Sequence, residues 1–271
     1  MKKILACSDW HVGSNWGLWP DKFRAEDPRT GDLDEWILNQ TQKKLWKMFQ
    51  YMIKKSKDVD IIILNGDLCD GPQRKAWGRG TKTPDLDIQA KACESLINLL
   101  PDVPKYFTQG SEYHSMGDRP IEQYLADKTG GEFGDDLCID ECGIRTYARH
   151  FVPVSKSAWM YRTTPVARDL MLLALSSTPE HYGHVDLAVF SHAHYKCGVT
   201  LGGQTGIITP CFQARTPFAV KVGITTPPDI GFCIIEVEKG PSGRMHVNPK
   251  FYSEKLGKPC KIVGRDAKCR K

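Results

Sequence analysis

Residues 59–70 read VDIIILNGDLCD, and this stretch decides the fold of the chain. Residues 59–64 form a nearly continuous apolar run rich in isoleucine, which is typical of a strand that is covered on both faces. The run ends abruptly in Asn65-Gly66-Asp67, a turn that follows the strand at once. The stretch therefore predicts a buried strand that delivers Asp67 and Asp70 to one edge of a sheet.

Two further stretches repeat this arrangement of a short apolar strand followed by polar side chains. Residues 4–7 (ILAC) precede Asp9 and His11, and residues 185–190 (VDLAVF) precede His192 and His194. Divalent cations need oxygen and nitrogen donors that converge from several directions. Three strand ends that each supply carboxylates or imidazoles therefore predict a metal-dependent hydrolase.

Strands and helices alternate along the first half of the chain, which indicates an α/β sandwich. Apolar residues at helical spacing predict helices at residues 45–53, 86–100 and 166–175. Further strands are expected at residues 105–108 and 144–148, with a hairpin at 232–237 and 245–252. Residues 12–33 are rich in Gly, Pro, Asp and Trp and are expected to form a long surface loop.

Length and charge suit one large domain with a basic tail. The chain has 271 residues, of which 41% are hydrophobic, and we expect a single domain over residues 1–253. Residues 254–271 are expected to form a basic extension, because 255–271 hold seven Lys or Arg against one Asp. The net charge of +5 favours polyanionic partners only mildly.

The cysteines are expected to be free thiols. The chain has ten cysteines, but no apolar leader follows Met1 and no span approaches the ~18 apolar residues of a membrane helix. These features predict a reducing, cytoplasmic setting and no membrane partner. Cys138 and Cys142 have no second close pair, so a structural zinc site is not expected.

The spacing of the polar residues suits two cations. Asp9 and His11 stand two residues apart, as do His192 and His194, and Asp67 can bridge two metals through its two oxygens. Two cations about 4 Å apart clamp a phosphate and lower the pKa of a bridging water toward ~7. Hydrolysis of a phosphoester by attack of a metal-bound hydroxide is the expected reaction.

In this order the motifs resemble those of the calcineurin-like metallophosphoesterases, whose pattern runs D-x-H, G-D-x-x-D, G-N-H-[DE], a lone His, and G-H-x-H. The match extends over roughly residues 4–195. The resemblance implies a four-layer α/β sandwich, in which two mixed β-sheets are flanked by α-helices, and a site for two divalent metal ions. Manganese is the metal we expect, with iron, zinc or nickel as alternatives for a site without thiolates.

The resemblance also implies a role for each matching residue. It places Asp9, His11 and His194 on one metal, Asp67 between the metals, and His192 on the other. Asp70 would orient the ligands from behind them. His150, at the end of an expected strand, is our candidate for the lone His of the second metal, and a buried or capping histidine is the alternative.

The third motif departs from the family pattern. Where the family has Gly-Asn-His, this chain has Gly110-Ser111-Glu112-Tyr113-His114. We expect Ser111 or Glu112 to contribute to the second metal site and His114 to protonate the leaving oxygen as general acid. Ser191 replaces the usual Gly before His192, which a strand end tolerates.

Four residues are candidates for substrate binding. Arg74, Lys75 and Trp77 lie on the loop after Asp70, where cations can hold flanking phosphates and an indole can stack on a base. Arg162 is a candidate phosphate clamp. The alternatives are a solvated loop and a surface ion pair.

These observations predict a two-metal phosphodiesterase, nuclease-like, that acts on nucleic acid (DNA or RNA) or on a nucleotide. A phosphomonoesterase, such as a protein or nucleotide phosphatase, is the alternative enzyme. A scaffold that kept the fold and lost its activity is the third hypothesis, supported only by the altered third motif. The sequence leaves the oligomeric state open.

Overall fold

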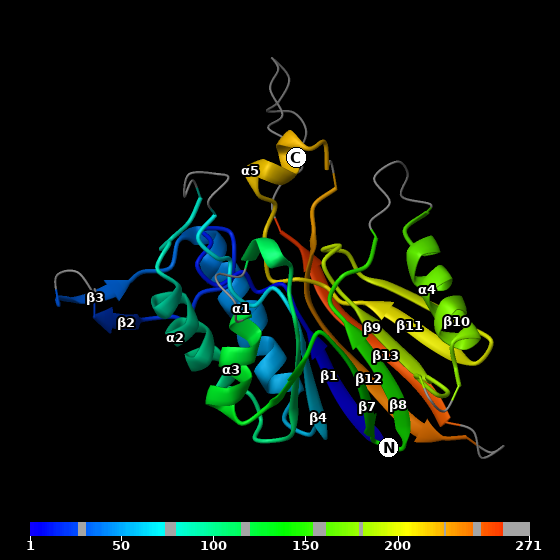
Figure 1. Ribbon diagram of the computed structural model, residues 1–271. Helices are drawn as coiled ribbons and strands as arrows, with labels where there is room; N and C mark the ends of the chain where they lie inside the picture. Colours follow the sequence, from blue (N-terminus) through cyan, green and yellow to red (C-terminus); the bar gives the residue numbers. More distant parts are fainter. Residues whose placement is uncertain are drawn as a thin grey trace, which may run out of the picture.

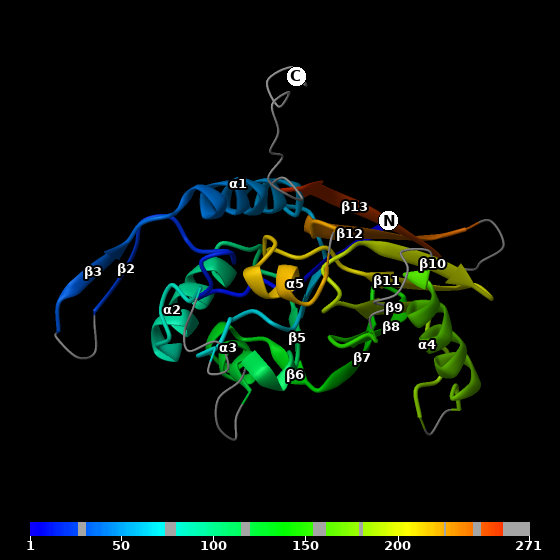
Figure 2. The same cartoon turned by 90° about the horizontal axis from the view of Figure 1, so that it is seen from above.

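Two mixed β-sheets lie face to face and carry helices on their outer faces (Figures 1 and 2). The computed structural model describes residues 1–26, 31–73, 80–114, 120–153, 161–178, 181–224, 226–240 and 245–256. A separate two-stranded hairpin, β2 (Phe23–Glu26) and β3 (Leu33–Trp36), projects from this body.

The first sheet has six strands in the order β13-β12-β1-β4-β5-β6. β1, β4, β5 and β6 run parallel, whereas β12 pairs antiparallel with both β1 and β13. The bounds are β1 Lys2–Cys7, β4 Ile61–Asn65, β5 Lys105–Thr108, β6 Glu132–Gly134, β12 Asp229–Lys239 and β13 Met245–Lys255.

The second sheet has five strands in the order β10-β11-β9-β8-β7. Its central strands β8, β9 and β11 are parallel, and the two outer pairs are antiparallel. The bounds are β7 Asp136–Glu141, β8 Ile144–Arg149, β9 Leu187–Phe190, β10 Cys197–Leu201 and β11 Gln204–Ile208.

Helices cover the outer faces of both sheets. Figure 1 shows α1, α2 and α3 on the side of the first sheet and α4 on the side of the second. A 3₁₀ turn, η2, and a short helix, α5, lie in the connections. The bounds are α1 Gln40–Lys55, α2 Leu86–Ile97, η2 Glu112–His114, α3 Ile121–Thr129, α4 Thr164–Leu175 and α5 Pro217–Lys221.

Three hydrophobic clusters fill the three spaces between these layers, and the alternation along β1 shows why. Ile4 and Ala6 point between the two sheets, whereas Leu5 and Cys7 point toward the helices, because successive strand residues face opposite sides. A third cluster joins α4 to the second sheet through residues such as Leu170. The predicted four-layer sandwich is therefore confirmed.

The carboxyl ends of the central strands of both sheets meet at one edge. Asn65, the last residue of β4, donates from its side-chain amide to the carbonyl of Arg149 at 3.1 Å and to the hydroxyl of Ser191 at 2.6 Å. Arg149 ends β8 and Ser191 follows β9. The side chains that follow β1, β4, β5, β8 and β9 are consequently gathered in one place.

The structure corrects one expectation and adds elements that the sequence analysis did not predict. Residues 12–33 are not simply a surface loop, because Val12, Leu18 and Trp19 are fully buried and the segment enters the β2–β3 hairpin. α3, β6 and β7 were not anticipated. The last described strand runs to Lys255, and residues 257–271 of the expected basic extension lie outside the described part of the chain.

The eight cysteines in the described segments are free thiols, as expected. Among the described helices, none combines the length and the apolar character that crossing a bilayer requires.

Candidate metal centre

The backbone at the strand ends adopts a conformation that side-chain-bearing residues rarely take. Eight non-glycine residues in the described part of the chain have positive φ, and five of them are predicted ligands. They are Asp9 (51°), His11 (45°), Asp67 (51°), His192 (69°) and His194 (55°). Such strain costs about 1–3 kcal/mol per residue and clusters at functional sites. Here it turns five side chains away from their strand directions and into one space.

The first group of donor atoms comes from Asp9, His11 and His194, whose ligand atoms all lie within 4.8 Å of one another. His194 Nε2 is 3.2 Å from Asp9 Oδ1 and 3.4 Å from His11 Nε2. Two imidazole nitrogens pointing at one another and at a carboxylate form a donor set for a divalent cation.

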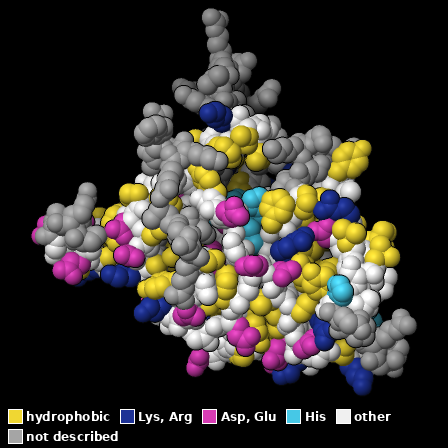
Figure 3. Space-filling view, in the orientation of Figure 1, with side chains coloured by type: hydrophobic (Ala, Val, Ile, Leu, Met, Phe, Trp, Pro, Cys, Tyr) yellow, Lys and Arg dark blue, Asp and Glu magenta, His cyan; other side chains and the backbone are white. Residues whose placement is uncertain are grey.

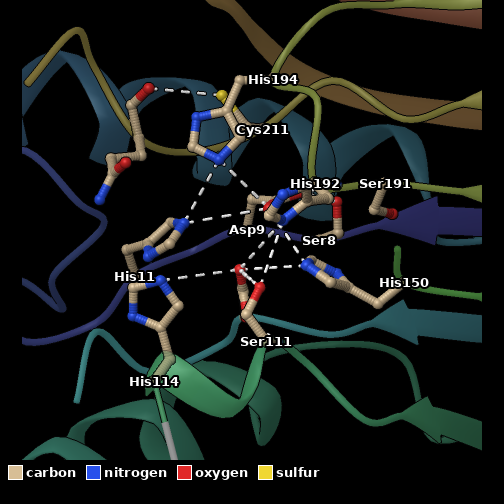
Figure 4. A network of polar contacts seen from close by, with 12 residues as sticks. Ser8, Asp9, His11, Ser111, His114, His150, Ser191, His192, His194 and Cys211 are labelled. Atoms are coloured by element: carbon tan, nitrogen blue, oxygen red, sulfur yellow. Dashed lines mark hydrogen bonds and ion pairs between the residues drawn. The ribbon is translucent and has the colours of Figure 1, made fainter. Parts of the chain in front are cut away.

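The second group comes from Asp67, His150 and His192 and meets the same 4.8 Å limit. His150 Nε2 lies 3.0 Å from Asp67 Oδ2, and His192 Nδ1 lies 4.0 Å from the same oxygen. His150 Nε2 is also 4.0 Å from Asp9 Oδ1, so the two groups adjoin. Figure 4 shows the histidines reaching this space from different sides.

Ser111 joins the second group, and Glu112 does not. The Ser111 hydroxyl lies 3.1 Å from Asp67 Oδ2 and 3.2 Å from His192 Nδ1, between two of the donors. The backbone N–H of Ser111 donates to Asp67 Oδ1 at 2.6 Å. Glu112 is exposed and is in none of the donor groups found among the described residues. The geometry thus favours Ser111 of the two alternatives.

Two buried polar atoms test whether the site suits cations. Asp9 Oδ1 and His150 Nε2 are shielded from solvent and have no well-aligned hydrogen bond within the described part of the chain. Polar atoms buried in this way are costly unless something satisfies them. A cation held by carboxylate oxygens and imidazole nitrogens would do so, and the donor set therefore fits the divalent metals expected from the sequence.

In the second group, the carboxylate and the imidazole beside it stabilise each other's charged forms. Asp67 and His150 are 1% and 2% exposed. Burial would raise the pKa of Asp67, but His150 and His114 beside it bring that pKa well below its usual range. Burial would lower the pKa of His150, but Asp67 and Asp9 raise it to about 9. The site thus stabilises two buried carboxylates only when positive charge stands beside them.

The first group behaves in the same way. Burial would raise the pKa of Asp9, but His194 and His150 lower it below its ordinary value. Burial would lower the pKa of His194, yet Cys211 and Asp9 raise it well above the usual range. Cys211 is fully buried and lies beside His194, as Figure 4 shows.

Asp70 and His114 lie behind and beside His11. Asp70 Oδ1 is 3.3 Å from His11 Nδ1, which leaves Nε2 of His11 directed at the first group. The Asp70 carbonyl accepts a hydrogen bond from His114 Nδ1 at 2.7 Å. Nε2 of His114 therefore points into the site, 3.8 Å from Asp67 Oδ2. Asp70 thus contacts His11 and His114, and its orienting role stays a prediction.

A 3₁₀ turn explains how the altered third motif still reaches the site. The N–H of His114 donates to the Ser111 carbonyl at 2.9 Å, closing η2. In such a turn, side chains three residues apart lie on the same side. His114 and Ser111 consequently both face Asp67, while Glu112 faces solvent.

Glycines allow the close approach of the neighbouring segments. A Cβ on Gly66 would stand 2.6 Å from His150 Nδ1, and one on Gly110 would stand 2.5 Å from Asp67 Oδ1. Gly66 also has a φ of 76°. These two positions therefore exclude a side chain at the strand ends that hold the second group.

A buried chain of hydroxyl and amide groups runs beneath the donors. The hydroxyl of Ser8 donates to Asp9 Oδ2 at 2.5 Å and is 2.7 Å from the hydroxyl of Thr209. Thr209 is in turn 2.7 Å from the hydroxyl of Ser191, which accepts from Asn65. All of these side chains are fully buried. The chain holds Asp9 Oδ2, so that Oδ1 is left facing the first group.

The structure describes only one of the four predicted substrate-binding residues. Arg74, Lys75 and Trp77 lie outside the described residues. Arg162 is described, but its guanidinium stacks 4.7 Å from the ring centre of Tyr195 and donates to the Thr226 hydroxyl at 2.8 Å. Arg162 is thus engaged beside the strand end that carries His194.

Comparison with known families shows what part of the chain is similar to. The sequence profile of the calcineurin-like phosphoesterase family matches residues 2–111, which contain the first two motifs and the start of the third. The resemblance predicted from the sequence is therefore confirmed, and together with the His and Asp groups it supports a metal-binding hydrolase of phosphoesters. A comparison with curated protein sequences finds no match.

Several solved structures are similar to the chain at low identity. An archaeal phosphodiesterase shares 12% identity, with 92% of this chain and 99% of that chain covered and a TM-score of 0.45. Vps29 from Entamoeba histolytica shares 11%, with 92% and 99% covered and a TM-score of 0.43. A conserved protein from Streptococcus pneumoniae, described as a predicted phosphoesterase, shares 9% identity, with 94% of this chain and 97% of that chain covered and a TM-score of 0.41.

Sequence reasoning missed the residues that support the ligands. Ser8 and Asn65 stand next to predicted motifs, and a polar residue one or two positions before a ligand was the available signal. Thr209 and Cys211 lie after β11 with no motif around them. Glu122 was missed as well, because it lies on the unpredicted helix α3.

Replacing Thr209 by Val is expected to break the buried hydroxyl chain at its centre. The change keeps the shape but leaves the hydroxyls of Ser8 and Ser191 short of a partner, at a cost of about 1–3 kcal/mol. Urea unfolding should show this loss, and calorimetric titration with manganese should show weaker binding through Asp9. Thr209→Ser keeps the hydroxyl and is the control; equal behaviour of the two variants would contradict the proposed role of the chain.

Glu122 is expected to make the stability of the protein depend on pH. Its carboxyl is buried and accepts from the N–H of Leu68 at 3.2 Å. Burial, and then the Asp67 carboxylate, raise the pKa of Glu122 above its ordinary 4.5. In the folded protein Glu122 therefore keeps its proton to higher pH than in the unfolded chain, so its contribution to stability falls as pH rises from about 4.5.

Glu122→Gln removes this titration and keeps an oxygen for the Leu68 N–H. The variant should gain stability relative to the parent protein as pH rises from about 4.5 toward neutrality. Urea unfolding of both proteins over this pH range is the measurement. A constant difference in unfolding free energy would show that the pKa of Glu122 is the same in both states.

Proposed function

We propose that the protein is a two-metal phosphodiesterase that acts on nucleic acid or a nucleotide. The observation that carries this proposal is the pair of adjoining donor groups, one around Asp9 and one around Asp67, with His150 Nε2 within 4.0 Å of a carboxylate oxygen in each. Donor groups so close together suit two cations that share one substrate phosphate. We expect manganese in both positions.

The residues of the chain divide the work between holding, orienting and proton transfer. Asp9, His11 and His194 would hold one cation, and Asp67, His150, His192 and Ser111 would hold the other. Bound divalent cations neutralise phosphate charge and supply a deprotonated water at neutral pH. Asn65 orients His150, whose Nδ1–H donates to its carbonyl at 2.7 Å.

His114 is proposed to protonate the leaving oxygen as general acid. Its Nδ1 carries a hydrogen, because the Asp70 carbonyl can only accept. In the protonated ring Nε2–H is then a donor directed into the site on the side of Asp67. His114 also has a ligand atom within 4.8 Å of ligand atoms of His11 and Asp67. A role as a further metal ligand is therefore the alternative, and an experiment has to distinguish it from a role as general acid.

The described rim of the site favours diesters over monoesters. Glu112 is exposed one residue after Ser111, where its carboxylate repels a dianionic monoester more than a monoanionic diester. Arg162 and Arg74 are the two cations that a monoesterase could use; Arg162 is stacked on Tyr195 and donates to Thr226, whereas Arg74 lies outside the described residues. These contacts support the diesterase over the phosphatase.

The proposal is tested on a panel of phosphate esters with the metal-loaded protein. With manganese we expect turnover of bis-p-nitrophenyl phosphate and of single-stranded DNA or RNA, at a higher kcat/KM than p-nitrophenyl phosphate. Asp67→Asn removes the central carboxylate charge and should abolish activity. Turnover of the monoester alone would favour a phosphatase, and manganese binding without any turnover would favour a scaffold.

The His114→Asn variant tests whether His114 acts as a general acid or as a metal ligand. A general acid contributes about 10²–10⁴-fold when the leaving oxygen is basic, and little when it leaves readily as p-nitrophenolate. We expect the variant to lose that factor on a dinucleotide but to keep most of its activity on bis-p-nitrophenyl phosphate, with manganese affinity unchanged. Equal losses on both substrates together with weaker manganese binding would instead make His114 a ligand.

A further inference from the structure

The geometry points to Phe151 as a specificity-determining residue that stacks on a nucleobase of the substrate. This inference rests on the proposed phosphodiesterase function and narrows it to nucleoside phosphodiesters. Phe151 follows His150 directly and belongs to no motif that the sequence analysis used. Its position, its exposure and its support by neighbouring residues carry the argument.

The Phe151 side chain is 53% exposed, although both of its neighbours in the chain are buried. His150 is 2% exposed and Val152 is fully buried. The backbone on either side of Phe151 is thus anchored in the protein while its ring faces outward. Single exposed apolar side chains are common on protein surfaces, so this exposure shows only that the ring is free to contact a substrate.

The ring also lies against the candidate metal centre. Its centre is 5.0 Å from that of the His192 ring, with a tilt of 48° between the planes. His192 belongs to the second donor group, and its ring is also 5.3 Å from that of His150. Phe151 is therefore close enough to contact an ester substituent of a phosphate held by this group.

The backbone of Phe151 is held by contacts that do not involve its ring. Arg149 Nε donates to the Phe151 carbonyl at 3.1 Å, and the same guanidinium donates to Asp169 at 2.5 Å. Its carbon centre lies 5.5 Å from the ring centre of Phe190. Truncating the Phe151 side chain consequently leaves this arrangement in place.

An aromatic face recognises a nucleobase, not a phosphate. Phe151 carries no charge, so it has nothing to offer the phosphate itself, whereas every base has a π-face on which a phenyl ring can stack. Figure 3 shows hydrophobic side chains beside the histidines in the hollow on this face of the molecule. The surface next to the second donor group thus suits a flat, weakly polar substituent.

Two diesters with the same leaving group and the same charge test the inference. Thymidine 5′-(p-nitrophenyl phosphate) carries a base, and methyl p-nitrophenyl phosphate does not. With manganese, Phe151→Ala should raise KM for the thymidine ester about fivefold or more, the range expected for one lost base stack, and leave KM for the methyl ester within twofold. Phe151→Trp should restore the thymidine value, and Phe151→Leu should not.

Controls separate recognition from structural damage. Leu175→Ala truncates an apolar side chain at the end of α4 that is even more exposed, at 77%, and should change KM for neither substrate. Manganese affinity of Phe151→Ala should equal that of the parent protein. The inference would be overturned if Phe151→Ala left the KM of each ester unchanged, or if it raised both KM values by the same factor.

Binding of thymidine 5′-monophosphate, followed by calorimetry, gives a readout that does not need turnover. The manganese-loaded parent protein should bind it at least fivefold more tightly than Phe151→Ala does. If the parent protein turns over neither ester, the proposed function fails, whereas a Phe151-dependent affinity for the nucleotide would still support the inference. Equal affinities would overturn the inference and leave the function standing.

Discussion

Two buried carboxylates, Asp9 and Asp67, are the constraint on which the rest of the site depends. Each is at most 1% exposed, and burial alone would drive each toward its neutral form. His194 and His150 reverse that tendency, at the expense of raised pKa values of their own. A region of the protein that keeps two anions dry must hold positive charge there, and divalent cations are the form of charge that these donors suit.

The two sheets share the task of placing these carboxylates. Asp9 and Asp67 follow strands of the first sheet, whereas His150, His192 and His194 follow strands of the second. The hydroxyl chain from Ser8 through Thr209 to Ser191, continued by Asn65, ties the strand ends of both sheets together. The site therefore exists only when the sheets pack as they do, and the strained turns at the strand ends are stabilised by that packing.

Much of this could be predicted from the sequence. Continuous apolar runs marked β1, β4 and β9, because strands buried on both faces leave little else in their sequence, and the polar residues after them marked the site. The hairpin nature of residues 23–36 and the helix at Ile121–Thr129 were missed, because short or weakly patterned segments take their form from tertiary packing. Thr209 and Cys211 were missed for a related reason, since only the fold brings them beside ligands far away in the chain.

The altered third motif illustrates how local geometry can preserve a site while its sequence changes. Ser111 is shorter than the Asn of the family pattern, but its N–H and its hydroxyl both reach Asp67, because Gly110 lets the backbone approach. The histidine falls two residues later than in the family, yet the 3₁₀ turn returns it to the same side as Ser111. Five residues here thus present the serine and the histidine to one carboxylate, and the extra residues place Glu112 at the rim. The altered motif is therefore weak support for a scaffold, because Ser111 still reaches Asp67 and His192 in the second donor group.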